Sequence, residues 1–375
     1  MRLQFLPQLD DLIASLRAEG FEVLAPRPLD GRFVFTPIAQ AAELAHALRP
    51  VTAPGVHRLK PDDSSTPRRL FEHAYAPAAL KPLVFAPHEP RMRAVRDASG
   101  RLRFETVQPD LKPTAVLGVR ACDLAALALQ DAHFLRAGHV DEAYAARRKA
   151  LFLIAVDCRT PLETCFCAAT GDGPAARETF DLAMTELDDG FVVRAGSKRG
   201  ENLLAGLPTT EAAEEQIDAA HRIVAAATQA QTRTLPTGHL PNRLWAAQDS
   251  AHWDAVAERC VACGNCTSVC PTCFCHDVQE QPSLDGRSSE TERVWDSCFT
   301  ANHGHMAGWR VRPDTASRYR QWMTHKFAGW VDQYGRSGCV GCGRCIAWCP
   351  AGIDLLEELH RVVDAPPPDR EAPRP

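Results

Sequence analysis

The pattern of apolar and polar positions divides the chain into a first part that alternates strands with helices and a second part dominated by helices. In the first part, compact apolar runs bounded by turn residues predict buried strands. Between the last two runs, a helical pattern begins near Asp123, the expected N-cap, and ends near Leu135, which predicts a strand–helix–strand unit. The apolar runs occupy residues 21–25, 33–35, 114–119 and 151–156.

Other segments of the first part also have clear local signals. A short helix is predicted over residues 10–19, and a loop over residues 50–70, which are rich in Pro, Asp and Ser. An Asp-Asp-Gly turn at 188–190 lies between two apolar runs and predicts a hairpin. The Ala- and Glu-rich residues 210–229 predict a long helix.

A segment with two prolines and a glycine, residues 232–242, marks the predicted domain boundary. We expect a mixed α/β domain over residues 1–235 and a helical domain over residues 243–362. Residues 363–375 are rich in proline, which predicts a disordered tail. The predicted fold class is therefore α+β, with a mixed α/β domain followed by an all-helical domain.

The composition adds one informative number, the 15 cysteines among 375 residues. This is too sparse for a small disulfide scaffold and too many for an ordinary intracellular enzyme. A net charge of −5 argues against a basic nucleic-acid scaffold. The N-terminus lacks the apolar stretch of a secretory signal, and no apolar run is long enough to span a membrane. We therefore expect a cytoplasmic protein whose reduced cysteines bind metal.

One cysteine pattern, C-x2-C-x2-C-x3-C-P, occurs twice and matches the bacterial two-cluster ferredoxin motif. Three thiolates spaced three positions apart can surround one iron–sulfur cube, with Gly264 and Gly343 relieving the tight turns. The fourth thiolate lies one helical turn further on and points toward the other cube. Two zinc sites are the alternative, but the repeated four-cysteine spacing with its trailing proline favours iron–sulfur.

The expected ligation is therefore crossed, with two [4Fe–4S] clusters that each take one thiolate from the other motif. The first set, called group I, consists of Cys260, Cys263, Cys266 and Cys349. The second set, called group II, consists of Cys339, Cys342, Cys345 and Cys270.

The two motifs are separated by 68 residues, 271–338, far more than in a compact small ferredoxin. This insert has a helical pattern that is clearest at 318–331, which favours an all-helical two-cluster architecture over the small βαββαβ one. Basic residues such as Arg318 and Lys326 alternate there with aromatic residues. We interpret them as a helix face beside a cluster or a docking surface for an acidic partner, rather than a nucleic-acid site.

Four cysteines of the first part form the next candidate set, group III. Cys122 and Cys158 each follow a predicted parallel strand, so both are expected at one edge of the sheet, near Cys165 and Cys167. Three interpretations stay open for these thiols: a third [4Fe–4S] cluster, ordinary buried cysteines, or a zinc site.

The last three cysteines are expected to pack around a cluster. The alternative is a further metal site completed by His276 or His303. His303 and His305 are interpreted as structural or exposed side chains. The three cysteines are Cys273, Cys275 and Cys298.

Several segments together resemble the beta subunit of cytosolic sulfhydrogenases, which is similar to one of the subunits of anaerobic sulfite reductase. The resemblance is densest at 114–170 and 258–356, and it departs from the family pattern at Ala121, where proline is expected. The segments are Gly118–Leu124, Glu163–Cys167, Cys260–Cys275, Trp295–Phe299, Arg318–Lys326 and Ser337–Asp354.

The resemblance implies an iron–sulfur electron-transfer subunit of a cytoplasmic oxidoreductase complex. Its implied partners are a subunit that binds flavin and NAD(P)H and a catalytic subunit of the nickel–iron hydrogenase or sulfite reductase type. The chain itself has no P-loop, and its G-x-G-x-x-A match at 171–176 does not follow a predicted strand. The alternatives are a self-contained iron–sulfur reductase with a substrate site in the first domain, and a nucleic-acid-binding iron–sulfur protein. We expect no nucleic-acid or membrane partner and no catalytic residue in this chain.

Overall fold

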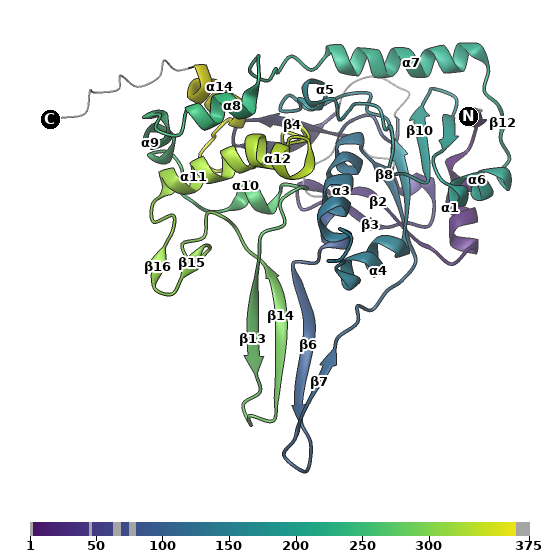
Figure 1. Ribbon diagram of the computed structural model, residues 1–375. Helices are drawn as coiled ribbons and strands as arrows, with labels where there is room; N and C mark the ends of the chain where they lie inside the picture. The colour runs from purple at the N-terminus through teal and green to yellow at the C-terminus, as the bar shows by residue number, and fades with distance from the viewer. Residues whose placement is uncertain (1–2, 45–46, 63–68, 75–79, 365–375) are drawn as a thin grey trace.

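The protein is seen here as a computed structural model, in which a sheet-containing body adjoins a helical part and two hairpins project away from both (Figure 1). The predicted disordered tail, 363–375, lies outside the described residues except for its first two positions, which end the last helix. The predicted division at 232–242 remains a prediction. The structure describes residues 3–44, 47–62, 69–74 and 80–364.

The body is built on an eight-stranded sheet. Its strands are β1 (Gln4–Leu6), β2 (Glu22–Leu29), β3 (Arg32–Pro37), β8 (Thr114–Val119), β9 (Leu151–Val156), β10 (Leu182–Glu186), β11 (Phe191–Ala195) and β12 (Thr210–Glu211). Their order is β12-β1-β11-β10-β9-β8-β2-β3, and β10, β9, β8 and β2 run parallel to one another. Every residue of β9 is buried, because helices cover both faces of the sheet.

The helices of the body cover both faces of the sheet, and successive residues of a strand point to opposite faces. They are η1 (Ala41–Leu44), α1 (Leu9–Ala18), α2 (Lys81–Val84), α3 (Ala121–Phe134), α4 (Glu142–Ala150), α5 (Cys167–Thr170), α6 (Lys198–Ala205) and α7 (Glu214–Gln229). Val116 of β8 packs with α3 and α4, whereas its neighbour Leu117 packs with α1 and α6. The predicted strand–helix–strand unit is confirmed, so β8 and β9 end at the same edge of the sheet.

A second sheet connects early and late parts of the chain. It consists of β6 (His88–Arg96), β7 (Leu102–Thr106), β13 (His276–Pro282) and β14 (Ser288–Trp295). The order is β13-β14-β6-β7, and all its pairings are antiparallel. The two hairpins hang side by side below the body in Figure 1, where β14 pairs with β6.

The prediction of an all-helical second part is wrong, because this part contains β13, β14 and the small ribbon of β15 (His305–Met306) and β16 (Trp309–Arg310). Every residue of β13 is exposed, so no alternation of apolar residues marks the strand, and its pairing with β14 stabilises it. The predicted loop at 50–70 is also wrong in part, since it contains the hairpin of β4 (Leu48–Ala53) and β5 (Val56–Pro61). Both strands of this ribbon have an unpaired edge. Proline, which has no amide hydrogen to donate, is tolerated there.

The helical part gathers around a second core. Its elements are α8 (Leu240–Ala246), α9 (His252–Ala257), α10 (Asn265–Ser268), α11 (Thr315–Thr324), the π-helical turn η2 (His325–Gly329), α12 (Trp330–Tyr334), α13 (Arg344–Ala347) and α14 (Leu355–Asp364). Apolar side chains of these helices pack together with cysteines of both motifs. The helix predicted at 318–331 is confirmed, whereas the one predicted at 210–229 begins at Glu214, because Thr210 and Glu211 pair with β1.

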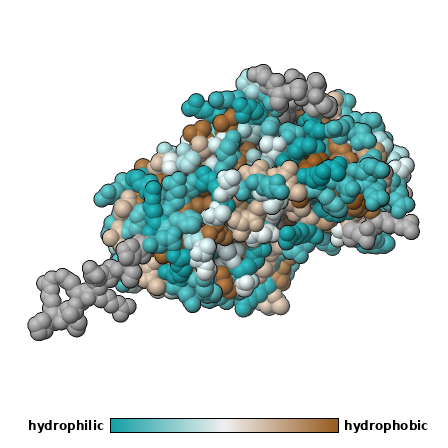
Figure 2. All heavy atoms as spheres, turned by 90° about the horizontal axis from the view of Figure 1, so that it is seen from above, coloured by the Kyte–Doolittle hydropathy of each residue, from teal (hydrophilic) through white to brown (hydrophobic). Residues whose placement is uncertain are grey.

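Hydrophilic side chains predominate on the face shown in Figure 2, where hydrophobic atoms form small separate patches. No helix in the described part of the chain has the length and apolar character needed to cross a membrane. The large buried clusters of apolar side chains in the described residues lie on the two faces of the sheet and among the helices around the cysteine motifs.

Candidate metal centres

The four thiols of group I line one pocket in the helical part. Cys345 of group II also lines this pocket, so the two groups adjoin. Burial raises the pKa of Cys266, and the nearby Cys260 and Cys349 thiols add to the shift. The pocket therefore gathers three thiols of the first motif and two of the second, Cys345 and Cys349. The apolar walls of the pocket include Phe299, Tyr319, Trp322, Ile353 and Leu355.

The four thiols of group II lie close enough together to affect one another's pKa values. Burial raises the pKa of Cys339 to about 12, and Cys342 and Cys270 act on it in the same direction. Burial likewise raises the pKa of Cys345 well above its ordinary value, again with Cys270 among the contributing charges. A hydrogen bond from Cys273 lowers the pKa of Cys270, and so does the nearby ammonium group of Lys326.

The donor chemistry of both groups suits an iron–sulfur cube. A buried thiol with a raised pKa keeps its proton until a metal replaces it, so metal binding is coupled to proton release. Among the described residues, no three His, Cys, Asp or Glu side chains converge on a position for one metal ion. A cube is larger than an ion and binds each thiolate at a separate corner.

Glycine allows each motif to turn into a short helix, as predicted. Gly264 and Gly343 are the N-cap residues of α10 and α13, with φ of 73° and 68° in the left-handed region that favours glycine. A Cβ on Gly343 would also lie 2.1 Å from the carbonyl oxygen of Thr164. The second motif therefore packs backbone against backbone on the loop that carries Cys165 and Cys167.

The thiols of group III lie at the edge of the large sheet where β8 and β9 end. Cys122 is in the first turn of α3, and Cys158 follows β9. Cys167 begins α5, and Cys165 lies two residues before it. Burial raises the pKa of Cys167 to about 12, with Cys158 and Cys342 contributing to the shift. Cys165 Sγ lies 3.9 Å from the Cys342 carbonyl oxygen, so group III adjoins group II.

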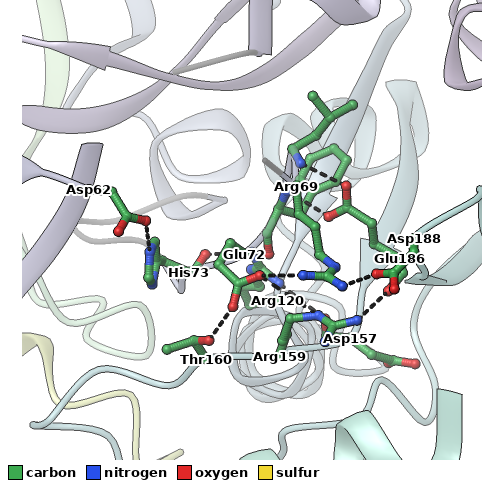
Figure 3. A network of polar contacts seen from close by, with 12 residues as sticks. Asp62, Arg69, Glu72, His73, Arg120, Asp157, Arg159, Thr160, Glu186 and Asp188 are labelled. Atoms are coloured by element: carbon green, nitrogen blue, oxygen red, sulfur yellow. Dashed lines mark hydrogen bonds and ion pairs between the residues drawn. The ribbon is translucent and has the colours of Figure 1, made fainter. Parts of the chain in front are cut away.

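Arg120 holds this edge of the sheet together (Figure 3). The residue lies between β8 and α3, and its side chain is 1% exposed. It binds the end of β9 and the segment before α2, and thereby positions Cys122 relative to Cys158. The sequence points to Arg120 only as part of the segment Gly118–Leu124. Its role was not predicted, because the residues it binds are distant in the chain. It donates hydrogen bonds to the carbonyls of Val156 (3.3 Å), Asp157 (3.2 Å), Phe71 (2.9 Å) and His73 (2.6 Å).

A buried ion pair connects groups II and III. Asp123 of α3 and Arg344 of α13 are both 2% exposed, and their closest atoms are 2.6 Å apart. The prediction that Asp123 caps α3 is wrong, because Arg120 is the N-cap residue and the carboxylate faces Arg344. This pair was missed because 221 positions separate its members.

The remaining candidates form a fourth set, group IV, consisting of Cys273, Cys275, Cys298 and His303. These four side chains line one pocket together with His325 and Lys326. Hydrogen bonds from Cys298 and His303 lower the pKa of Cys275 to about 4, although burial opposes the shift. Contact with Cys275 raises the pKa of His303 to about 9, and Asp296 contributes. The other two histidines considered, His276 and His305, are exposed on β13 and β15.

Comparison with known proteins adds to this geometry. Residues 259–353, which contain both motifs, match the family model of a 4Fe-4S dicluster domain. Over 252 residues, which cover 66% of this chain and 73% of the relative, the sequence is 34% identical to sulfhydrogenase 2 subunit beta of Pyrococcus furiosus. No solved structure matches the chain.

The dicluster domain and the two motifs define an iron–sulfur protein of the 4Fe–4S class. The chain belongs to the family of sulfhydrogenase beta subunits, as its sequence segments indicated. The domain match supports [4Fe–4S] clusters without giving their number.

Proposed function

We propose that the chain is an electron-transfer subunit of a multi-subunit oxidoreductase of the hydrogenase type, with two [4Fe–4S] clusters held by groups I and II. The observation that carries the proposal is that each motif's fourth cysteine lies near thiols of the other motif. Cys349 lines the pocket of the first-motif thiols, and Cys270 is an electrostatic neighbour of Cys339 and Cys345. Shared ligation keeps two cubes close together, which favours electron transfer between them.

The contacts between the groups support an ordered route for electrons. Cys345 lines the group I pocket, and the Cys342 carbonyl contacts Cys165 of group III. A third [4Fe–4S] cluster in group III extends this route to the edge of the large sheet. Its four thiols are buried or half-buried, and each of Cys122, Cys165 and Cys167 has Cys342 among its charged neighbours.

Bound clusters supply reversible one-electron chemistry, and the surrounding residues bury and orient them. The aromatic side chains that line the group I pocket make the surroundings of a bound cluster less polar, which affects the reduction potential. Lys326 Nζ lies 3.4 Å from Cys270 Sγ, where it donates to a predicted group II ligand. Hydrogen bonds to ligand sulfur are a second determinant of cluster potential.

The partners follow from the family and form part of the proposal. They are a subunit that binds flavin and NAD(P)H and a catalytic subunit of the hydrogenase or sulfite-reductase type, assembled in the cytoplasm. The chain relays single electrons between them, so hydride chemistry and substrate reduction occur in the neighbours.

Redox assays on the full chain, purified without oxygen, test this function. Dithionite should bleach its visible absorbance, and oxidised benzyl viologen should restore the absorbance as electrons leave the clusters. The isolated chain should show no steady reduction of sulfite or polysulfide and no hydrogen evolution. Sustained turnover of any of these substrates by the chain alone would contradict the relay and favour a self-contained reductase.

A further inference from the structure

Among the described residues, group IV is a half-buried set of ligand-type side chains that the proposed relay leaves without a role. Its residues come from two loops that the β13–β14 hairpin brings together, one before β13 and one after β14. His276 pairs with Trp295 at the base of the hairpin, and the Asp296 amide donates to the Cys275 carbonyl at 3.0 Å. The hairpin therefore places Cys275, which precedes it, beside the loop that follows it.

His303 is oriented as a metal ligand would be. Its Nδ1 lies 2.7 Å from a carboxylate oxygen of Asp296, while the ring contacts Cys275. A carboxylate on one ring nitrogen holds the imidazole and directs the other nitrogen toward a metal. His276 lacks this arrangement, because its side chain is exposed on β13 and its Nδ1 contacts the Phe274 carbonyl.

Two buried lysines lie in this region: Lys326 contacts sulfur atoms, and Lys81 has Cys273 among its charged neighbours. Lys81 and Lys326 are each 4% exposed, and a buried cation is costly without an anion nearby. Lys326 Nζ lies 3.6 Å from Cys273 Sγ and 3.0 Å from the Thr272 hydroxyl. Lys81 Nζ contacts the Thr267 carbonyl oxygen at 3.3 Å and lies 3.8 Å above the Trp295 ring. The cations thus favour thiolates or an anionic cluster in the pocket.

The helix next to the pocket is distorted where it supplies pocket residues. The π-helical turn η2 carries His325 and Lys326, both of which line the group IV pocket. Single π-helical turns are rare and occur frequently at functional sites. The distortion accompanies the placement of Lys326 between Cys270 and Cys273.

We propose that Cys273, Cys275, Cys298 and His303 bind a further iron–sulfur cluster, with three thiolate ligands and one imidazole ligand. Cysteine and histidine together are ligands of iron–sulfur clusters and of zinc. The contact of Cys273 with Cys270 places this centre beside group II, where a redox-active cluster can exchange single electrons with the relay. Only the exchange of electrons with the relay rests on the proposed function. The binding site is inferred from its own four residues and their surroundings.

The full chain with Cys275→Ser and Cys298→Ser together, prepared without oxygen, tests the site. Iron and acid-labile sulfide should each fall by about four atoms per chain relative to the unchanged protein, as expected for loss of one [4Fe–4S] cluster. The electron paramagnetic resonance signals of the reduced group I and group II clusters should remain. Their persistence separates this result from a failure of the relay itself.

Histidine variants give a second measurement that does not depend on the double variant folding. His303→Cys should retain the iron but change the resonance spectrum and lower one reduction potential, because imidazole ligation raises the potential relative to thiolate. His276→Ala is the matched control and should leave iron content and spectrum unchanged. Unaltered iron in the double variant, an unaltered spectrum and potential in His303→Cys, or zinc in place of the lost iron would each overturn the proposal.

Discussion

At the scale of single residues, buried charges hold the cysteine groups in position. Arg120 binds four carbonyl oxygens beside group III, and Asp123 pairs with Arg344 between groups II and III. Lys326 contacts sulfur atoms of groups II and IV. A buried charge that loses its partners is costly, so each of these residues fixes the relative positions of the segments it joins.

The crossed ligation makes a prediction that depends on single cysteines. Cys266→Ala and Cys349→Ala should remove or convert the same cluster, although the residues lie in different motifs. Cys270→Ala and Cys342→Ala should affect the other cluster. Electron paramagnetic resonance of the reduced variants should therefore sort them into these two pairs. Sorting by motif instead, with Cys270→Ala resembling Cys266→Ala, would contradict the assignment.

The buried ion pair makes a prediction about stability. Asp123→Asn leaves Arg344 buried without its anion, and breaking such a pair costs roughly 3–5 kcal/mol. The thermal unfolding midpoint of the variant, measured without oxygen, should fall clearly below that of the unchanged protein. Asp218→Asn on the exposed face of α7 is the control and should change stability by less than about 0.5 kcal/mol. Equal midpoints for the two variants would show that the pair is unimportant.

At the scale of elements, the sequence predicted what has a local signal. Buried apolar runs indicated β8 and β9, and cysteine spacing indicated the two motifs, because both signals lie within a few residues. The exchange of fourth thiols between the motifs stays a prediction. The parallel arrangement then predicted that Cys122 and Cys158 share one edge. The exposed strand β13 has no apolar alternation, so its pairing was not predicted. The same holds for contacts such as Asp123 with Arg344, which depend on how distant elements pack.

The packing of the second motif against the group III loop predicts a difference between two glycines. Ala at either Gly335 or Gly343 forces a left-handed backbone, which costs roughly 1–2 kcal/mol. At Gly335 no atom of the described residues lies within 4 Å of the added Cβ, whereas at Gly343 it would overlap the Thr164 carbonyl. Gly343→Ala should therefore lower the unfolding midpoint and iron content more than Gly335→Ala. Similar effects of both substitutions would argue against the close contact between the loops.

Group III makes a prediction about the number of clusters. Replacing Cys165 and Cys167 with Ala should remove about four irons per chain if these thiols hold a third [4Fe–4S] cluster. The signals from groups I and II should persist, since their ligands are untouched. Iron content measured on variant and unchanged protein in parallel checks this. Unchanged iron would make group III ordinary buried thiols, and loss of zinc instead would make it a zinc site.

At the scale of the whole molecule, the cysteine groups form one connected set across both parts of the chain. Group II contacts group I through Cys345, group III through Cys342 and group IV through Cys270. The large sheet supplies the edge that carries group III, and the pairing of β14 with β6 ties the hairpin beside group IV to the body. This connectivity fits a subunit that conducts electrons between neighbours.

Metal analysis of the anaerobically purified full chain tests the central claim most directly. Two cubes in groups I and II predict at least about eight irons and eight acid-labile sulfides per chain. A cluster in group III and one in group IV would each add about four of both. Reduction with dithionite should produce paramagnetic signals from these clusters. A colourless protein that contains zinc and gives no such signal after reduction would contradict the account.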